Sequence, residues 1–542
     1  MEGRAGLRSG VMTIPGRPTK AWAVGFWCAV FALQAWRVRG PLLDDAFILF
    51  RYAAHIGSGY GPVWNAGEAP TEGYTSFLYV LGMALPAWLG WDLPACAFAF
   101  GLFCALGSIF LVYQGVRAAG GGARAAHIGC GLFALNPFLV QNATSGMETP
   151  LYILLILGSF YFAVRGVTSS VSHWYAAFGL GFLATLARPE GALFAIVLAA
   201  AGWGWLAPDR RRTVLKAFAL GAVLPGAVYM AWRLWTFGHL LPNPFYVKQG
   251  GGLFSRAGTA YVLRFVFPAS FPFLLLLLKR LADEAARRTV TFSTGTVCAV
   301  LTALLGFYCT VDPLMGEGFR FLTPLLPLLF VACAPEVDAA VHWGAHRLFR
   351  PVFFAMFVGY AYLSHPVYLR DAVLGRPPSP EAPVAVEARL GKALTPLRTP
   401  ERSVAWGDAG ALAYYSRWRF LDIAGLNDNF IARSRNYPLR EVVRYIFDQA
   451  PTLIVIPTER GTGPDAASVF RRGHGPHGHE VYQALLKHPE MDGYGYVVTF
   501  ETATYDLNLF VRRDTDSLEV LTRALREAGG KVLEQKRHDR TG

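Results

Sequence analysis

The chain has 542 residues, of which 53% are hydrophobic and 16% are charged, and its formal net charge is +13. The hydrophobic residues form repeated runs, and a run of about 20 residues is enough to cross the hydrocarbon layer of a membrane. This composition predicts an α-helical polytopic membrane protein and excludes a chain that folds entirely in water. The positive charge falls mainly in short turns between the runs, where it indicates membrane topology, so it predicts no nucleic-acid partner.

Eleven apolar runs follow one another in the first part of the chain. By their length they predict about eleven transmembrane helices in the lipid bilayer, near residues 21–36, 93–116, 125–141, 151–164, 174–186, 191–206, 214–235, 260–278, 290–311, 322–341 and 352–364. A further run, residues 75–89, contains Gly82 and Pro86. We expect this run to lie at the membrane interface instead of crossing.

Basic residues indicate which side of the membrane each loop faces, because short cytoplasmic loops are enriched in Lys and Arg. The N-terminal tail, residues 1–20, carries four such residues, so we expect it to be cytoplasmic. With residues 75–89 at the interface, the later basic turns, such as 210–212, fall on the same side. The sequence therefore predicts a multi-pass protein of the cytoplasmic membrane, with the long first loop, residues 40–92, and the C-terminal region on the extracytoplasmic face.

Four prolines between positions 377 and 383 mark a linker after the last apolar run. We therefore predict two domains, a transmembrane catalytic domain at 1–366 and a soluble extracytoplasmic domain at 367–542. Alternating apolar patterns predict a small α/β fold for the second domain. The expected strands are 403–406, 419–423, 452–456, 494–499 and 507–512, and the expected helices are 439–449 and 517–527.

Two adjacent acids, Asp44 and Asp45, stand where the first apolar run ends. Charged groups near the membrane core are costly and usually mark a substrate or ion path, so we expect this pair to carry chemistry. The alternative is an N-cap and its neighbour for an interfacial helix that begins near Ala46. Adjacent helical residues point about 100° apart, so a regular helix cannot aim both acids at one hydroxyl group.

Further polar residues occur in loops that the topology places on the same extracytoplasmic face. They are Arg51, Glu72 and Tyr74 in the first loop, and Glu148, Arg188, Glu190, Asn243, Tyr246, Lys248 and Arg320 in later loops. Separate loops that bring acids, bases and aromatic residues to one face predict a site. Three of these residues have alternatives, because Glu148 and Glu190 also suit the start of a helix and Lys248 also suits a solvated loop.

An enzyme on the extracytoplasmic face has no supply of nucleotide sugars or ATP, but a polyprenyl-phosphate sugar reaches it through the bilayer. The sugar of such a donor already carries a phosphate leaving group. The enzyme then needs a carboxylate that accepts the proton of the acceptor hydroxyl and fixed cations for the phosphate charge. Asp44 or Asp45 supplies the carboxylate, and the candidate cations are Lys248, Arg320 and Arg188.

Short motifs in both domains combine into a specific pattern, although each is weak alone. They lie at residues 43–48, 72–78, 145–151, 187–191, 242–248 and 319–321, and in the C-terminal domain at 407–410 and 422–428. Together they resemble the C-type glycosyltransferase superfamily, most of all the branch that contains the mycobacterial terminal arabinofuranosyltransferase. The protein mannosyltransferase and lipid A aminoarabinose transferase families are more distantly similar.

This resemblance implies the C-type glycosyltransferase fold and inverting transfer of a sugar from a polyprenyl-phosphate donor to a cell-envelope acceptor. The acid pair is then catalytic, with Asp44 slightly favoured as the main acid. Donor and phosphate binding would fall to Lys248, Arg320, Arg188, Tyr246 and Asn243, and substrate binding to Arg51, Glu72, Tyr74, Glu148 and Glu190. Pro244 and Val247 stand where the branch usually has Thr and Ala, so arabinofuranose is the first expectation for the sugar, not a conclusion.

Other functions stay open at this point. Within the same superfamily the alternative is an enzyme similar to the protein or lipid mannosyltransferases, and the acceptor is a glycan, a glycolipid or a protein. A polytopic transporter or flippase would place its site near the midplane and often repeat one half of its fold, whereas a non-catalytic envelope scaffold would tolerate replacement of both acids. The cysteines have no metal-like spacing. The tract with His474, His477 and His479 suggests a metal site, but its Gly and Pro content favours a flexible surface loop. The sequence leaves open whether a divalent cation helps to hold the phosphate.

Overall fold

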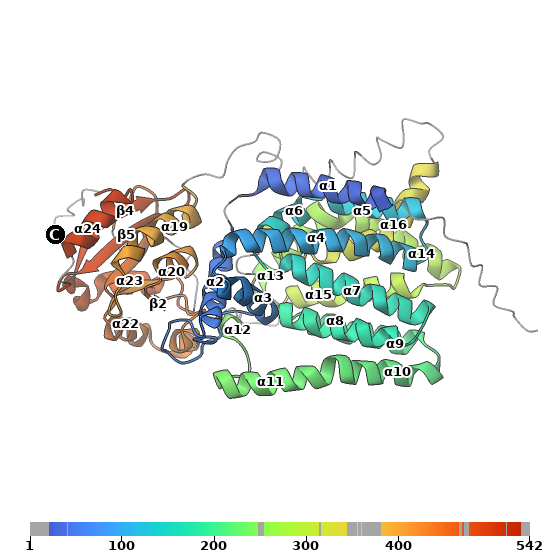
Figure 1. The fold of residues 1–542 in the computed structure, drawn as a ribbon, viewed down its shortest axis with the longest axis horizontal. Helices are drawn as coiled ribbons and strands as arrows, with labels where there is room; N and C mark the ends of the chain where they lie inside the picture. Colours follow the sequence, from blue (N-terminus) through green and yellow to red (C-terminus); the bar gives the residue numbers. More distant parts are fainter. Residues whose placement is uncertain are drawn as a thin grey trace, which may run out of the picture.

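The computed structural model describes residues 21–40, 42–247, 254–313, 316–343, 355, 359, 381–464, 469–470, 476–515 and 518–532. These residues form a long bundle of helices with a smaller α/β domain at one end (Figure 1). Nearly all of the predicted span at 352–364 lies outside the described residues, as do Lys248 and the first three prolines of the predicted linker.

Helices make up the whole of the bundle. They are α1 (Ala21–Val38), α4 (Leu93–Ala118), α5 (Ala123–Ala134), α6 (Pro137–Thr144), α7 (Thr149–Thr168), α8 (His173–Ala187), α9 (Gly191–Trp205), α10 (Pro208–Phe218), α11 (Leu224–Phe237), α13 (Arg256–Phe265), α14 (Phe271–Ala286), α15 (Phe292–Tyr308) and α16 (Leu325–Trp343). Among the described residues, three helical segments are long and apolar enough to cross a membrane, Leu93–Ala118, Thr149–Thr168 and Pro208–Phe237. The number of about eleven spans stays a prediction.

The predicted span at 125–141 is broken in two. Helices α5 and α6 meet at an angle of 57°. The break occurs at Asn136, whose side chain accepts hydrogen bonds from the backbone of Phe138 and Leu139 and so caps α6. Pro137 follows at the first helical position, where its missing N–H costs no hydrogen bond. A cap followed by proline starts a new helix, so the predicted span is a bent pair of helices, which together are long and apolar enough to cross a membrane.

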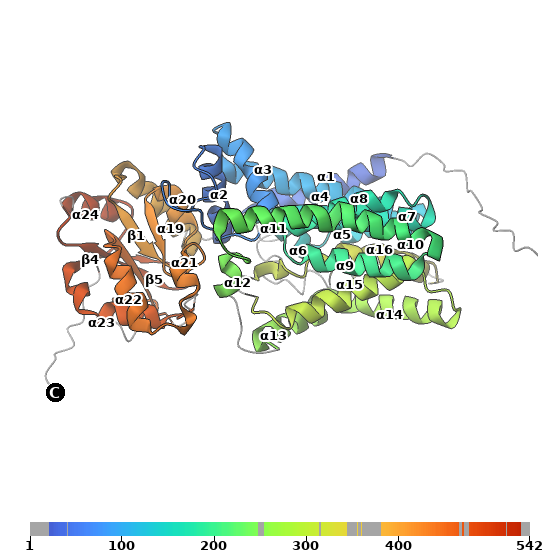
Figure 2. The same ribbon diagram turned by 90° about the horizontal axis from the view of Figure 1, so that it is seen from below.

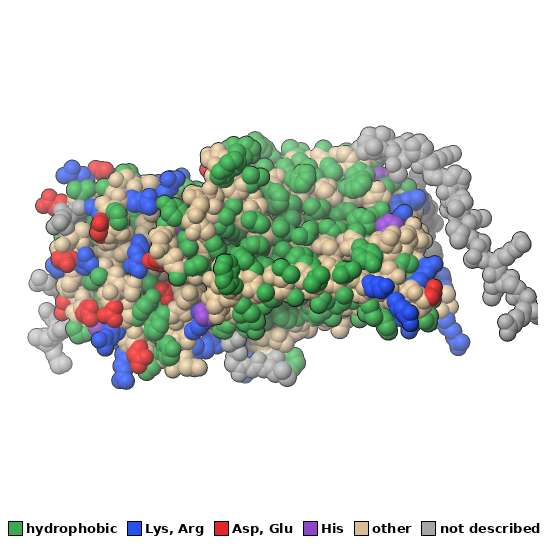
Figure 3. Space-filling view, turned by 60° about the horizontal axis from the view of Figure 1, so that its bottom comes forward, with side chains coloured by type: hydrophobic (Ala, Val, Ile, Leu, Met, Phe, Trp, Pro, Cys, Tyr) green, Lys and Arg blue, Asp and Glu red, His purple; other side chains and the backbone are tan. Residues whose placement is uncertain are grey.

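The segment Pro208–Phe237 runs along the edge of the bundle (Figures 1 and 2). Only 11% of its apolar window is buried, and Trp235 is 86% exposed. Hydrophobic side chains cover this side of the bundle, whereas charged side chains gather on the α/β domain and at the opposite end of the bundle (Figure 3). Exposed apolar helices of this kind suit a lipid environment, because their backbone groups are satisfied within the helix.

The small domain has a mixed five-stranded sheet. Its strands are β1 (Ser403–Trp406), β2 (Arg419–Asp422), β3 (Leu453–Thr458), β4 (Tyr494–Glu501) and β5 (Asp506–Arg512), in the order β2-β1-β3-β5-β4. Strand β1 is parallel to β2 and β3, and β5 is antiparallel to β3 and β4. The sheet packs with α19 (Pro383–Leu394), α20 (Ala411–Ser416), α21 (Asn429–Ala432), α22 (Leu439–Asp448), α23 (Glu480–Lys487) and α24 (Leu518–Glu527).

The predicted α/β fold of this domain is confirmed. All five expected strands and both expected helices are present, with ends within two residues of the prediction. Helix α19 was missed, because its first residue, Pro383, was assigned to the linker. Proline is favoured at the first position of a helix, so this proline begins the domain instead of preceding it.

One hydrophobic core joins the small domain to the beginning of the membrane part. Helix α2 (Asp44–Gly57), the loop after it and α3 (Phe77–Trp88) contribute buried side chains such as Phe50 and Trp64 to the core of the sheet, whereas most of the bundle has its own core. The 12-residue helix α3 is about 18 Å long, too short to cross a bilayer. Residues predicted as a loop of the transmembrane domain therefore pack with the α/β domain.

Candidate functional site

Helix α2 begins at Asp44, so the acid pair occupies its first two positions. Leu43 holds the N-cap position, and no side chain caps the helix. The alternative of an aspartate N-cap is therefore wrong. The two carboxylates have different partners, as the helical geometry requires: Asp45 binds a residue of the bundle and Asp44 binds the backbone of the α/β domain.

Asp45 forms an ion pair with Arg320, which lies in the loop between α15 and α16. Arg320 Nη2 is 2.6 Å from Asp45 Oδ2, and the two side chains are 4% and 17% exposed, respectively. A short 3-10 turn, η3 (Glu317–Phe319), leads into Arg320. Within this turn Phe319 has a φ of 51°, a left-handed conformation that is uncommon for a non-glycine residue. Two residues predicted for catalysis and phosphate binding thus meet in one buried pair.

Arg320 keeps two further donors that bind no described residue. Its Nε and Nη1 are buried, and neither has a hydrogen-bond partner in the described part of the chain. The ring of Phe321 lies 5.0 Å from the guanidinium carbon and packs against the group. A buried donor without a partner costs roughly 1–3 kcal/mol. Such donors suit a ligand that carries oxygen acceptors, and a phosphate group is one.

A second group of buried charges also lies against Phe321. Arg188 is 2.8 Å from Glu148 Oε1 and 2.6 Å from Glu190 Oε1, and all three side chains are at most 7% exposed. Tyr308 also donates a hydrogen bond to Glu190. The guanidinium carbon of Arg188 is 4.8 Å from the centre of the Phe321 ring. The two carboxylates offset the positive charge of Arg188. Arg188 therefore packs against the Phe321 ring but offers little uncompensated charge to a ligand.

Glu72 is paired with a residue that sequence reasoning missed. Arg233 Nη2 lies 2.6 Å from Glu72 Oε2, and each side chain is 6% exposed. Arg233 stands inside an apolar run that was predicted to cross the membrane, and a charge in such a run was itself a signal for a functional or paired group. The backbone N–H of Asn243 donates to Glu72 O at 3.0 Å, and its side chain donates to Asn429 of the α/β domain at 3.0 Å.

Arg51 connects α2 to the α/β domain. Its Nη2 donates to Asn65 Oδ1 at 2.9 Å and to Trp418 O at 2.8 Å, and its Nε donates to Trp64 O at 2.9 Å. A further donor binds Ala413 O. With four bonds to protein acceptors, Arg51 fixes the position of the domain relative to α2, and the structure places it away from the Asp45 pair.

The other residues predicted for the substrate lie near these groups. Tyr74 is buried, and its hydroxyl binds no described residue. Tyr246 lies in the short helix α12 (Asn243–Val247) with the guanidinium carbon of Arg433 4.7 Å from its ring centre. Lys248 follows α12 directly and falls outside the described residues.

Asp44 faces the turn that opens α20. The backbone N–H of Ala411 donates to Asp44 Oδ1 at 2.8 Å. Gly410 comes so close that a Cβ atom there would lie 2.1 Å from Asp44 Oδ2. Burial raises the pKa of Asp44 to about 8, and the nearby charge of Asp408 adds to the shift. Glu387 is also buried with a raised pKa, to which Asp44 contributes.

The expected preference for Asp44 as the main acid stays a prediction. A carboxyl group with a pKa of about 8 is mostly protonated at neutral pH, but its charged fraction is a stronger base than an ordinary carboxylate. Asp45 instead forms an ion pair with Arg320. Among the described residues, no group of three or more His, Cys, Asp or Glu side chains is arranged to hold a metal ion.

Two comparisons concern the sequence. A domain of unknown function, DUF8728, matches residues 382–512, which cover most of the α/β domain. The chain is also 28% identical over 296 residues to the terminal β-(1→2)-arabinofuranosyltransferase of Mycobacterium tuberculosis. That alignment covers 50% of this chain and 46% of the relative, so it spans about half of each protein.

The fold is similar to two solved structures. The crystal structure of ArnT from Cupriavidus metallidurans bound to undecaprenyl phosphate is 13% identical, with a TM-score of 0.56 over 90% of this chain and 97% of ArnT. The archaeal oligosaccharyltransferase AglB from Archaeoglobus fulgidus, in complex with an inhibitory peptide and a dolichol-phosphate, is 13% identical, with a TM-score of 0.54 over 92% of this chain and 75% of AglB. The predicted resemblance in fold is confirmed by these matches.

Proposed function

We propose that the chain is a membrane glycosyltransferase of the C-type superfamily, which is supported by its similarity in sequence to an arabinofuranosyltransferase and in fold to ArnT. It takes a sugar from a polyprenyl-phosphate donor and transfers it to a cell-envelope acceptor, which is a glycan, a glycolipid or a protein. Undecaprenyl phosphate and a dolichol-phosphate are bound in the similar structures of ArnT and AglB. The lipid carrier of this chain belongs to the same chemical class.

The observation that carries the proposal is the pair of Asp45 and Arg320. The pair is buried at the first turn of α2, and two donors of Arg320 remain without a partner among the described residues. A phosphate group of the donor accepts hydrogen bonds from these two N–H groups. The arginine thereby holds the phosphate close to a carboxylate, which is the arrangement that this transfer needs.

The reaction then proceeds by a single displacement. The carboxylate of Asp45 accepts the proton of the acceptor hydroxyl, and the hydroxyl oxygen forms a bond to the anomeric carbon of the sugar. The bond between that carbon and the phosphate oxygen breaks, and the polyprenyl phosphate leaves with the electron pair. Because attack and departure occur on opposite faces of the carbon, the anomeric configuration is inverted. Arg320 stabilises the charge that develops on the leaving phosphate.

Arabinofuranose is the sugar that we propose first, because the sequence relative is an arabinofuranosyltransferase. A hexose such as mannose is the alternative within the same mechanism. Asn243 and Tyr246, which we assign to donor binding, lie where α12 contacts the α/β domain. A sugar bound there would contact both α12 and the α/β domain. Lys248, next in the chain, remains a predicted partner of the phosphate.

The site is proposed to face the extracytoplasmic side of the cytoplasmic membrane. The acid pair and the α/β domain lie at one end of the bundle, and α10 begins at the other end with the basic turn 210–212 (Figure 2). Basic turns favour the cytoplasmic side, so this arrangement supports an extracytoplasmic site and a cytoplasmic N-terminus.

A transfer assay with the purified full chain tests the proposal. The chain is incubated with a membrane-envelope fraction and with radiolabelled decaprenyl-phosphate arabinofuranose or polyprenyl-phosphate mannose. Label should move to the envelope fraction from one of the two donors, and Asp45→Asn should abolish the transfer. Asp209→Asn, at an exposed position on α10, is the matched control and should transfer normally. Transfer that is unchanged in Asp45→Asn would contradict the assignment, and Glu148 and Glu190 would be the next acids to replace.

A further inference from the structure

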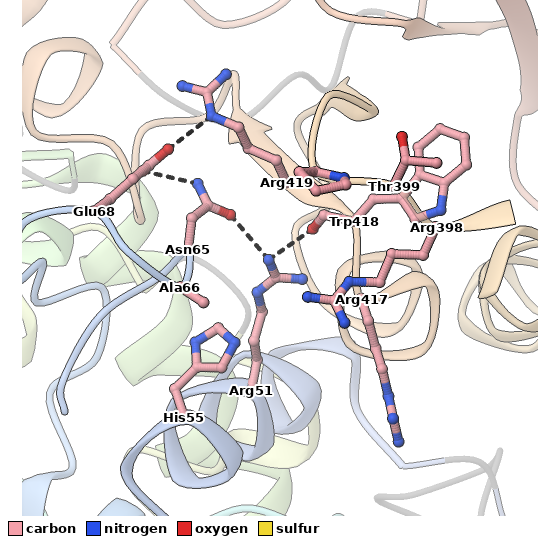
Figure 4. Close-up of a pocket in the computed structure, with 11 residues that line it drawn as sticks. Arg51, His55, Asn65, Ala66, Glu68, Arg398, Thr399, Arg417, Trp418 and Arg419 are labelled. Atoms are coloured by element: carbon pink, nitrogen blue, oxygen red, sulfur yellow. Dashed lines mark hydrogen bonds and ion pairs between the residues drawn. The ribbon is translucent and has the colours of Figure 1, made fainter. Parts of the chain in front are cut away.

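A basic cavity lies between α2 and the α/β domain, apart from the Asp45 pair. Its volume is about 390 Å³. The residues that line it come from α2, from the first loop and from the turns around 398–400 and 417–419 (Figure 4). Its charged and titratable lining residues are Arg51, His55, Glu68, Arg398, Arg417 and Arg419. Four arginines thus face one glutamate, so the cavity has an excess of positive charge.

Two of the arginines are already used by the protein. Arg51 donates to three backbone carbonyls and an amide oxygen. Arg419 is 2.7 Å from Glu68 Oε1, and its Nη2 donates to Gln449 at 2.7 Å. The single carboxylate of the cavity is therefore committed to Arg419.

The remaining two arginines, Arg398 and Arg417, have no such partner. Both are exposed, and neither side chain makes a hydrogen bond or ion pair with a described residue. Arg417 is the C-cap of α20 and has a φ of 56°. Its backbone is held in this turn, between Ser416 and Trp418, which are both buried. Two guanidinium groups at the edge of one cavity can each offer paired N–H donors to an oxyanion.

The lowered pKa of His55, which lines the cavity, is consistent with the positive charge around it. Burial, helped by the nearby charges of Arg51 and Arg398, lowers the pKa of His55 to about 4. His55 is therefore uncharged at neutral pH, and its Nδ1 lies 2.9 Å from Val63 O. An anion in the cavity would offset the charge of the arginines that depress this pKa.

We propose that this cavity is a second anion site, which binds a phosphate group carried by a glycan or by a lipid headgroup. Arg398 and Arg417 provide the free donors, and Arg51 adds positive charge from the cavity wall. The site is separate from the proposed reaction centre. Arg51 follows Asp44 by seven residues on α2, which corresponds to about 10 Å along the helix axis. Neither Asp45 nor Arg320 lines the cavity.

Binding is measured on the purified full chain in a non-ionic detergent, without any transfer reaction. The first probe is inorganic pyrophosphate, and its binding is measured by calorimetry at low salt. The second probe is a series of detergent micelles mixed with phosphatidylglycerol or with phosphatidylcholine. Binding of the lipid is detected as a shift in the Tm of the protein. Arg398→Gln and Arg417→Gln are the test variants, because both positions are exposed and their loss should not affect folding. Arg440→Gln is the matched control, an exposed arginine on α22 that does not line the cavity.

The proposal expects each test variant to weaken pyrophosphate binding by about fivefold and the double variant to weaken it further, since an exposed charge pair contributes up to about 1 kcal/mol. Arg440→Gln should bind as the wild type does, and binding should fall as salt is added. A Tm shift with phosphatidylglycerol that the double variant loses assigns the site to a lipid headgroup, and pyrophosphate binding without that shift assigns it to a soluble phosphate. Failure of the wild type to respond to either probe, or equal losses in Arg440→Gln, would overturn the proposal.

Discussion

Arg320 donates a hydrogen bond of 2.6 Å to Asp45, although the two residues are 275 positions apart in the chain. This pair joins the first turn of α2 to the loop before α16, with Arg320 buried and Asp45 partly buried. The arginine orients the carboxylate with one nitrogen and keeps two others for a ligand. One pair of residues can therefore serve both the acceptor hydroxyl and the donor phosphate.

Asp45→Asn should lower the rate of sugar transfer by about 100- to 10,000-fold, the usual cost of losing a general base. The amide keeps the size of the side chain and can still accept the hydrogen bond from Arg320, so the fold should persist. Initial rates at saturating donor, together with Tm, check the prediction. A variant with wild-type Tm and near wild-type turnover would show that another group accepts the proton.

Arg320→Lys should keep the positive charge but lose the forked geometry of the guanidinium, since an ammonium group offers its donors from a single point. We expect kcat to fall by about 100-fold, as for the loss of one donor that stabilises developing charge, with a smaller change in KM. Steady-state kinetics over a range of donor concentrations separate the two constants. A change confined to KM would mean that Arg320 binds the donor equally in the ground state and the transition state.

Asp44 should make the contact between α2 and the α/β domain sensitive to pH. Its pKa is raised from 3.8 to about 8 in the folded chain, so the folded state holds a proton that the unfolded state releases. The stability linked to this proton is fully present below pH 3.8 and is lost as the pH rises through about 8. Tm should therefore fall between about pH 4 and pH 8.

The Asp44→Asn variant is the control for that prediction. Asparagine can still accept the N–H of Ala411 but does not titrate, so the decrease in Tm with pH should become shallower. Glu387 is a neighbouring buried acid whose pKa is also raised. Its titration should therefore preserve part of the dependence of Tm on pH in Asp44→Asn. Equal slopes for the wild type and for Asp44→Asn would contradict the assignment of this proton to Asp44.

Much of the fold could be predicted, because it depends on local patterns. The strand Ser403–Trp406 was predicted residue for residue, since a short apolar run between polar turns is typical of a buried strand. The break between α5 and α6 was missed, although Asn136 and Pro137 are a cap and a helix start in sequence. The apolar pattern continues through both helices and concealed the break.

The partners within the site could not be predicted in the same way. The motifs placed Glu148, Arg188 and Glu190 in loops on one face, but which acid pairs with which base depends on contacts between distant elements. Arg188 and Glu148 are 40 positions apart, and Asp44 and Ala411 are 367 positions apart. The different surroundings of Asp44 and Asp45 depend on such distant contacts, so local sequence patterns could not show them.

Arg188→Met should destabilise the fold by about 3–5 kcal/mol, because it leaves two buried carboxylates without their cation. Its effect on Tm should be partly reversed when Glu148→Gln and Glu190→Gln are added, since neutral amides need no cation. Unfolding of each variant in the same detergent checks the order of stabilities. If the triple variant is no more stable than Arg188→Met, the loss comes from packing against Phe321 and not from the unpaired charges.

Gly410→Ala should disturb the docking of the α/β domain on α2. The added Cβ would lie 2.1 Å from Asp44 Oδ2 and 2.3 Å from Asp44 O, too close for either atom to stay in place. Overpacking at a buried contact typically costs about 1–3 kcal/mol, and here it also displaces the bond from Ala411 to Asp44. Limited proteolysis should cleave this variant faster than the wild type near the domain contact. Gly493→Ala, where a Cβ meets nothing within 4 Å, should be cleaved at the wild-type rate. Transfer activity should also fall when the docking is disturbed, because α2 carries Asp45 as well as Asp44. A Gly410→Ala variant with normal proteolysis and normal activity would contradict this coupling.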